Sequence, residues 1–245
     1  DGNTLAVGAP GEDSAATVIN GNEQGNARTD SGAAYVFVRS AGTWTQQAFL
    51  KASNADMFDN FGLAVAISGD GSTVAVGAPG EDSAAIKVNG NQGNNSAQDA
   101  GAAYVFSRSG TTWTQQAYVK PTNTESDDWF GYSLALASDG NTLLVGAPWE
   151  DSGARGVNGD QGNNDVNKAG AAYVFTRSGA TWSSPTYLKA SNSGVKDWFG
   201  WQVSVSGDGS TLAVGAPEED SAATGINGDQ NNNARTSAGA IYVFA

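Results

Sequence analysis

The sequence consists of one unit that recurs four times at a spacing of 69 residues. The segment Leu5–Pro10 returns as Val74–Pro79, Leu143–Pro148 and Leu212–Pro217, and no insertion or deletion breaks the register. A repeat of this kind is one supersecondary unit that buries its apolar faces only against neighbouring copies. We therefore treat residues 1–245 as a single tandem-repeat region, with copies beginning near residues 1, 70, 139 and 208. We expect this region to be part of a longer array.

Each repeat contains four short segments that favour β-strands. In residues 61–67 the apolar side chains Phe61, Leu63, Val65 and Ile67 alternate along the chain, which places them on one face of a strand. The Leu-Ala-Val-Gly-Ala-Pro run is the second strand, residues 32–37 represent the third, and residues 43–51 represent the fourth and outermost. No segment has a helical period with caps. Four antiparallel strands repeated without helices predict an all-β chain of β-propeller blades.

The order of these strands leaves the blades at both ends incomplete. The chain begins with strands two, three and four of one blade, continues through two whole blades, and finishes with strands one, two and three of another. This amounts to 14 strands, or about three and a half blades. Both end blades supply strands two and three, so they cannot merge into one. We expect that the chain does not close a propeller alone, and that its unpaired edges make it oligomeric or aggregating in isolation.

Two short motifs in each repeat resemble the FG-GAP repeat family. Phe-Gly opens one strand and Gly-Ala-Pro closes the next, at residues 61–62 with 77–79, 130–131 with 146–148, and 199–200 with 215–217, while the first copy has only residues 8–10. The resemblance covers essentially the whole chain. It implies blades like those of the integrin α-subunit head, and it is closest to the bacterial secreted and surface proteins of this family.

The chain departs from the family at its usual calcium loop, which is of Asp-x-Asp/Asn-x-Asp-Gly type and precedes the Gly-Ala-Pro strand. At that place the sequence has Ser68-Gly-Asp-Gly-Ser72 and its relatives. One carboxylate per loop cannot supply the several oxygen ligands that calcium requires. We therefore expect these segments to be hairpin turns, which Asp and Gly favour.

The composition excludes several classes of function. The formal net charge is −13, with 25 acidic and 12 basic residues, and this charge repels the phosphates of nucleic acids. No apolar run approaches the roughly 18–20 residues of a membrane helix, so we expect no membrane insertion. The chain has neither Cys nor His, which rules out disulfides, thiolate zinc sites and a cysteine nucleophile.

Candidate binding residues lie in the long polar loops that follow Gly-Ala-Pro. Carboxylates and amide carbonyls are the oxygen ligands that calcium prefers, so these loops are candidate calcium sites. Two other interpretations stay open, because Asn, Asp and Gly are also common turn residues that bond their own loop, and the loops could contact a ligand or partner directly. The candidates are Glu12, Asp13, Asn20, Asn22, Glu81, Asp82, Asn89, Asn91, Glu150, Asp151, Asn158, Asp160, Glu219, Asp220, Asn227 and Asp229.

No catalytic set emerges, because the paired carboxylates Glu12 and Asp13 recur in every copy, whereas catalysis usually needs one asymmetric site. We expect a non-catalytic extracellular or cell-surface scaffold or adhesion module, whose partners are proteins or further copies of the repeat. The alternative is a glycan-binding propeller with the repeated loops as its sites. The repeated Trp44, Trp113 and Trp182 favour packing between blades over carbohydrate stacking, and Trp149 is a candidate exposed anchor on its loop.

Overall fold

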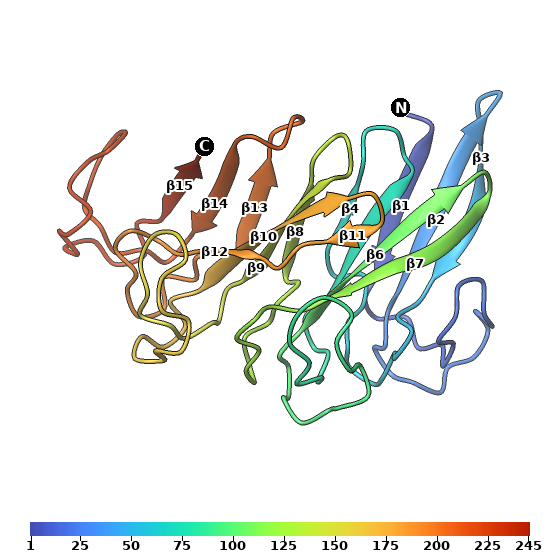
Figure 1. Cartoon of the computed structure of the whole chain (residues 1–245), viewed down its shortest axis with the longest axis horizontal. Coiled ribbons are helices and arrows are strands. Elements are labelled where there is room, and N and C mark those ends of the chain that lie inside the picture. Colours follow the sequence, from blue (N-terminus) through green and yellow to red (C-terminus); the bar gives the residue numbers. More distant parts are fainter.

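The computed structural model describes all 245 residues and is all-β, with four antiparallel sheets in chain order (Figure 1). The first sheet contains β1 (Thr4–Ala9), β2 (Ala33–Ser40) and β3 (Thr43–Leu50). The second contains β4 (Val65–Ile67), β5 (Thr73–Ala78), β6 (Ala102–Ser109) and β7 (Thr112–Val119). The third contains β8 (Ser133–Leu136), β9 (Thr142–Ala147) and β10 (Ala171–Ser178), with β11 (Thr181–Trp182) and β12 (Thr186–Leu188) both paired to β10. The fourth contains β13 (Gln202–Val205), β14 (Leu212–Ala216) and β15 (Ala240–Phe244).

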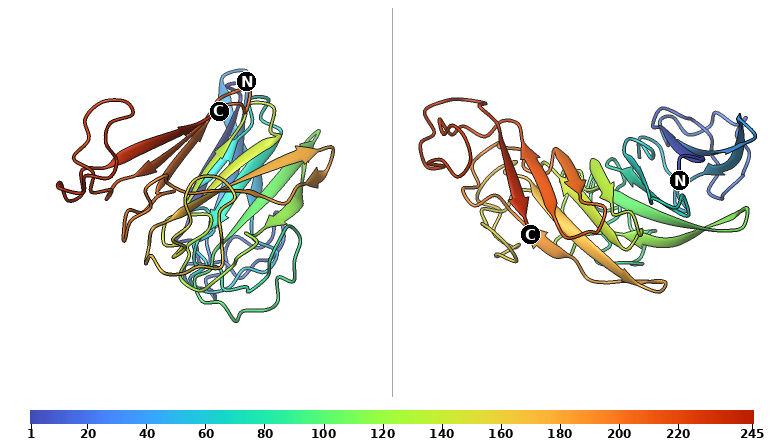
Figure 2. Two further views of the ribbon diagram at one scale, coloured as in Figure 1. Left: turned by 60° about the vertical axis from the view of Figure 1, so that its left-hand side comes forward. Right: turned by 90° about the horizontal axis from the view of Figure 1, so that it is seen from above.

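The predicted blades and the incomplete end blades are confirmed by this topology. Within each sheet the strands pair in sequence order, as in a propeller blade. Figure 2 shows the four sheets following one another along a curved row, with the first and last sheets at opposite ends. One chain therefore forms an open arc. None of its segments is a helix long and apolar enough to cross a membrane.

The Phe-Gly and Gly-Ala-Pro motifs meet where the backbones of neighbouring sheets touch. A Cβ atom added to Gly77 would lie 2.0 Å from the carbonyl oxygen of Gly131, and one added to Gly146 would lie equally close to that of Gly200. Gly131 also has a φ of 92°, a conformation that L side chains rarely adopt. Both glycines are therefore needed for two sheets to approach. Phe130, beside this contact, is fully buried, and its ring centroid lies 5.4 Å from that of Tyr173.

Neighbouring sheets pack through two different faces, which we call the leading face and the trailing face. The leading face of the second sheet carries large side chains, including Tyr104, Phe106 and Trp113. These pack against the trailing face of the first sheet, which carries smaller side chains such as Ala34 and Val36. The same arrangement joins the second sheet to the third. Each apolar layer is thus shared by two repeats, as expected for blades that cannot bury their faces alone.

Two details of the strands differ from the prediction. The strand expected over residues 61–67 is regular only in β4, because the backbone turns at Gly62, whose φ is 98°. Leu63 consequently does not join Phe61 in the core and is 44% exposed. The outer strand is continuous in β3 and β7 but divided into β11 and β12 in the third sheet, so the structure has 15 strands where 14 were predicted.

Candidate functional site

In the first three sheets each glutamate of the long loops forms an ion pair with a buried lysine. In the second sheet the Lys120 Nζ lies 3.0 Å from Glu81 Oε2 and donates a second hydrogen bond, of 2.6 Å, to the carbonyl of Gly101. Tyr118 and Asn54 donate to the other carboxylate oxygen at 2.9 and 2.8 Å. Each buried charge is therefore paired and hydrogen-bonded, the condition under which burial is tolerated. The equivalent pairs are Lys51 with Glu12 at 3.0 Å and Lys189 with Glu150 at 2.8 Å.

Burial has the largest effect on the pKa of the lysine in this pair. It lowers the pKa of Lys120, while the negative charge of Glu81 and its hydrogen bond raise it in part. The same causes act in the same directions on the pKa of Lys189. The side chains of both lysines are fully buried. These groups are therefore held inside the sheet stack and have no solvent face with which to meet a ligand.

The aspartates and asparagines of the loops accept hydrogen bonds from nearby backbone. Asp82 Oδ1 accepts from the backbone N–H of Asp99 at 2.9 Å and so closes its loop. Asn89 exchanges two hydrogen bonds with the backbone of Tyr118 in β7, at 2.7 and 3.0 Å. Asn91 Oδ1 accepts from the N–H of Gly93 at 3.1 Å. Equivalent contacts recur for Asp13, Asp151 and Asp220, for Asn20 and Asn158, and for Asn22, Asp160 and Asp229.

These contacts direct the predicted metal ligands to different partners instead of gathering them around one point. No group of three or more Asp, Glu, His or Cys residues lies in an arrangement that could hold a metal ion. Internal hydrogen bonds account for the recurrence of the loop residues. Calcium binding by the loops stays a prediction, tested by thermal melts in millimolar calcium and in excess chelator. A higher melting temperature with calcium would support the prediction, and identical melting temperatures would contradict it.

The short Asp/Gly segments before the Gly-Ala-Pro strands are turns, as the sequence indicated. Ser68 Oγ and the backbone N–H of Ser72 both donate to Asp70 Oδ1, at 2.6 and 2.9 Å. These hydrogen bonds lower the pKa of Asp70 to about 2. The Asp70 carboxylate therefore stabilises the turn in which it lies.

The outer-strand tryptophans of the second and third sheets, Trp113 and Trp182, pack between sheets as predicted, whereas Trp44 of the first sheet is 42% exposed. Trp113 is 5% exposed, and its indole N–H donates to Gln47 of the preceding sheet at 2.9 Å. Arg108 lies over the Trp113 ring and donates to the same glutamine oxygen at 3.1 Å. Gln116, Arg177 and Trp182 repeat this contact one sheet later.

Sequence reasoning missed a buried aspartate two residues before each Phe-Gly pair. Asp59 and Asp128 are 2% and 4% exposed, and each accepts a hydrogen bond from the backbone N–H three residues earlier, at 2.7 and 3.1 Å. Burial raises the pKa of Asp59 and Asp128 to about 8, and that of Asp197 to about 6. The three keep the 69-residue spacing, and that spacing was the signal available in the sequence.

Sequence reasoning also missed a column of aromatic rings that crosses from the third sheet to the fourth. The rings of Trp129 and Trp149 lie 3.7 Å apart, and Lys168 Nζ lies 3.3 Å from the Trp149 ring centroid. The ring centroid of Tyr132 lies 4.6 Å from that of Trp201, which directly precedes β13 of the fourth sheet. Trp149 is therefore half-buried by neighbours instead of exposed on its loop as an anchor.

The family assignment follows from the repeated glycine contacts and from comparison with known proteins. The FG-GAP repeat family matches residues 44–106, 113–175 and 182–244, which together span most of the chain. The chain belongs to the FG-GAP repeat family. Its Phe-Gly and Gly-Ala-Pro motifs are the two sides of the backbone contact between sheets.

The other comparisons are more distant. A putative 6-phosphogluconolactonase from Bacteroides uniformis is similar in structure, with a TM-score of 0.42 and 11% sequence identity. The similarity covers 77% of this chain and 42% of that protein, so the chain spans less than half of its length. No curated protein sequence matches the chain.

Proposed function

We propose that this FG-GAP array is a non-catalytic scaffold or adhesion module of a secreted or cell-surface protein, and a unit of a repetitive surface assembly. The observation that supports the proposal is that the repeated polar residues bond to other parts of the same chain. The glutamate of each of the first three copies is taken up by a buried lysine, and the aspartate of every copy by loop backbone. The residues that recur most strictly therefore build the stack, as suits a module whose function is to present a rigid surface.

The proposed absence of catalysis rests on the same repetition. A general acid or base must reach the proton that it transfers. Glu81 and Glu150 are each 1% exposed and already accept hydrogen bonds from lysine, tyrosine and asparagine. These hydrogen bonds favour a structural role for the glutamates that recur in each repeat.

Location is the direct test of this proposal. Intact cells of the source organism would be treated with protease and then fractionated, with an antibody against residues 1–245 as the probe. We expect the protein in the culture medium or in the protease-sensitive surface fraction. Its recovery only inside protease-treated, unbroken cells would contradict the proposal. A known cytoplasmic protein in the same samples controls for cell lysis.

The alternative is a glycan-binding propeller with identical sites on the repeated loops. It is favoured by the exposed amide side chains at the loop tips, such as Asn94 and Asn164, because amides can bond sugar hydroxyls. A glycan array separates the two functions, since several equal sites on one chain should give multivalent avidity. We expect no glycan to bind above the level of a heat-denatured sample. Saturable binding to one glycan class would favour the alternative.

A further inference from the structure

A lysine that follows β7 and an asparagine that precedes β4 are bonded to the same buried carboxylate. Glu81 is 1% exposed, and its Oε2 accepts a hydrogen bond from Lys120 Nζ at 3.0 Å. Its Oε1 accepts one from Asn54 Nδ2 at 2.8 Å. The amine nitrogen and the amide nitrogen therefore lie on the two oxygens of one carboxylate, where a single group can exchange protons with both.

The carbonyl oxygen of the same amide is held by a buried hydroxyl. Tyr104 is fully buried, and its hydroxyl donates to Asn54 Oδ1 at 2.7 Å. A donor at this oxygen stabilises the negative charge that develops when a nucleophile adds to the amide carbon. Burial lowers the pKa of Lys120, which favours the uncharged amine, the nucleophilic form of lysine. A nucleophile, an amide, a proton carrier and an oxygen donor therefore belong to one cluster.

The complete cluster recurs in the third sheet, 69 residues later. Glu150 Oε2 accepts from Lys189 Nζ at 2.8 Å, and its Oε1 accepts from Asn123 Nδ2 at 3.0 Å. The Tyr173 hydroxyl donates to Asn123 Oδ1 at 2.9 Å. Each of the two sheets therefore places the same four groups in the same hydrogen-bonding arrangement.

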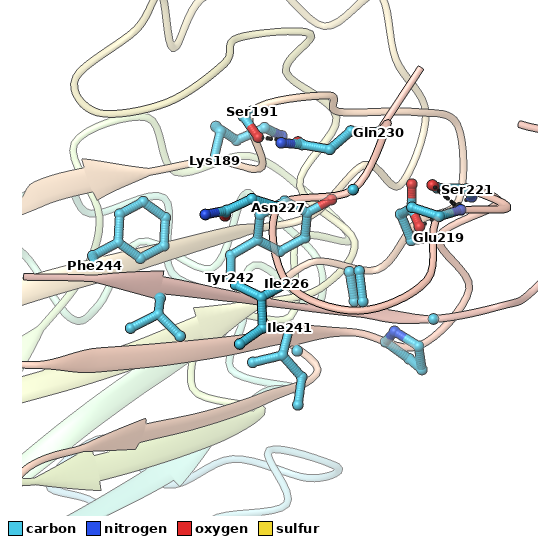
Figure 3. A pocket seen from close by; sticks show the side chains of 18 of the residues that line it. Lys189, Ser191, Glu219, Ser221, Ile226, Asn227, Gln230, Ile241, Tyr242 and Phe244 are labelled. Atoms are coloured by element: carbon cyan, nitrogen blue, oxygen red, sulfur yellow. Dashed lines mark hydrogen bonds between the residues drawn. The ribbon is translucent and has the colours of Figure 1, made fainter. Parts of the chain in front are cut away.

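The tyrosine, the asparagine and the glutamate keep this arrangement in the fourth sheet. The Tyr242 hydroxyl donates to Asn192 Oδ1, and Asn192 Nδ2 donates to Glu219 Oε1 at 2.8 Å. Figure 3 shows Tyr242 and Glu219 beside the pocket of this sheet. The asparagine is therefore a regular partner of the glutamate and not a feature of one copy.

We propose that Lys120 and Asn54, and likewise Lys189 and Asn123, become joined by an amide bond between their side chains. The bond from Nζ to Cγ forms and the bond from Cγ to Nδ2 breaks, so that each link releases one molecule of ammonia. The ion pair in the structure is the state before this reaction. The reaction takes place once within the chain, and it does not depend on the scaffold role or the location proposed above.

Glu81 carries the protons in the second sheet. It takes a proton from Lys120 along their hydrogen bond, which leaves a neutral amine and a neutral acid. The amine attacks Asn54 Cγ while the Tyr104 hydroxyl stabilises the carbonyl oxygen. Glu81 gives its proton to Nδ2, which leaves as ammonia, and takes a second proton from the attacking nitrogen. The atoms balance without a further reactant, and the buried ion pair is replaced by neutral groups, which are less costly to bury.

Each link closes a loop that contains one whole sheet. Residues 54–120 include β4 to β7, and residues 123–189 include β8 to β12. A covalent bond over such a span restricts the unfolded chain, as a disulfide does, in a sequence that has no cysteine.

The mass of the purified chain 1–245, measured under denaturing conditions after prolonged incubation of the folded protein, tests the proposal. We expect a mass lower than that of the sequence by two ammonia molecules. Asn54→Ala should reduce this deficit, taken against its own sequence, to one ammonia, and Asn54→Ala with Asn123→Ala should abolish it. Asn94→Ala replaces an exposed asparagine, and as the matched control it should keep the full deficit.

Tandem mass spectrometry of a protease digest locates the bonds. We expect peptides joined through Lys120 and Asn54. Glu81→Gln retains both reacting side chains but removes the proton carrier, so this link should be absent from that variant. Ring closure at an Asn-Gly pair such as Asn89-Gly90 also releases ammonia, but it joins no peptides and does not respond to Asn54→Ala.

The unaltered chain decides the question, whatever the stability of the variants. An intact mass equal to that of the sequence would overturn the proposal. A deficit that persists in the double variant, or a digest without linked peptides, would overturn it as well. Far-UV circular dichroism verifies that each variant is folded.

Discussion

The buried aspartates before the Phe-Gly pairs determine how stability depends on pH. The pKa of Asp128 is about 8 in the folded chain, against an ordinary value of 3.8. Between these values the folded state binds more protons than the unfolded state, so stability falls as pH rises from about 4 to about 8. The steepest slope is about 1.4 kcal/mol per pH unit for each such group. We expect Asp128→Asn to flatten this decline, so that the variant melts above the unaltered chain at pH 8 and not at pH 4.

Scanning calorimetry from pH 4 to pH 8 measures this effect. Asp127→Asn is the matched control, because Asp127 is an exposed neighbour whose left-handed backbone an asparagine also tolerates. It should leave the slope unchanged. Equal slopes of stability against pH for Asp128→Asn and the unaltered chain would show that Asp128 keeps its ordinary pKa in the folded state.

The buried ion pairs give a second prediction at the residue scale. Lys120→Met leaves the Glu81 carboxylate buried without its cation, which should cost about 3–5 kcal/mol in the free energy of unfolding. Adding Glu81→Gln should recover part of this loss, since a neutral amide is cheaper to bury. Urea denaturation measures both, with the exposed Lys87→Met as control. A loss below about 1 kcal/mol for Lys120→Met would indicate that water reaches Glu81.

Recurrence in the sequence identified Glu81 but not its partner. Lys120 lies 39 residues away, directly after β7, and only the folded sheet brings the two together. For the same reason Asp128 was missed, since the three residues before it are exposed and its burial depends on tertiary packing. Recurrence therefore indicated that Glu81 matters, whereas its contacts and the burial of Asp128 required the structure.

At the scale of strands, the glycine contact between sheets restricts side-chain size most strongly. Gly146→Ala would place a Cβ atom 2.0 Å from the Gly200 carbonyl, a backbone atom that cannot swing aside. We expect a loss of about 3 kcal/mol or more in the free energy of unfolding. Gly162→Ala is the control, because its Cβ would meet nothing closer than 3.5 Å, and it should change stability by no more than about 0.5 kcal/mol. Similar effects of the two substitutions in urea denaturation would refute the close approach.

The strands themselves were largely predictable, because alternation of apolar side chains and strict spacing both indicate them. The bulge in the outer strand was not, since it is a property of register between strands. Gln47 and Gln116 are the unpaired residues of this bulge. Pro185 takes the same place in the third sheet and divides the strand. Proline can replace a residue whose backbone N–H makes no hydrogen bond to the neighbouring strand. This explains why Pro185 stands where the first two sheets have glutamine.

At the scale of the whole molecule, counting strands was enough to predict an open arc with incomplete blades at both ends. The sequence could not show that the two ends are complementary. Trp44 on the leading face of the first sheet is 42% exposed, whereas its buried counterpart Trp113 is covered by the preceding sheet. At the other end the trailing face of the fourth sheet exposes Ile241 and Val243. Inside the chain these two kinds of face pack on each other.

In a purified chain of residues 1–245, these complementary faces should join separate copies head to tail. Such a contact is heterologous and does not close unless the rotation between copies completes a ring, so it yields a range of oligomers. We expect light scattering on a sizing column to give masses above the 24.9 kDa of one chain, rising with concentration. The double variant Ile241→Lys with Val243→Lys should shift the protein to the monomer, because it places charge on the trailing face. Val18→Lys, at an exposed loop position, should not. A monomer at all concentrations, with a cooperative melt, would mean that the exposed faces are stable in water and that the arc needs no second copy.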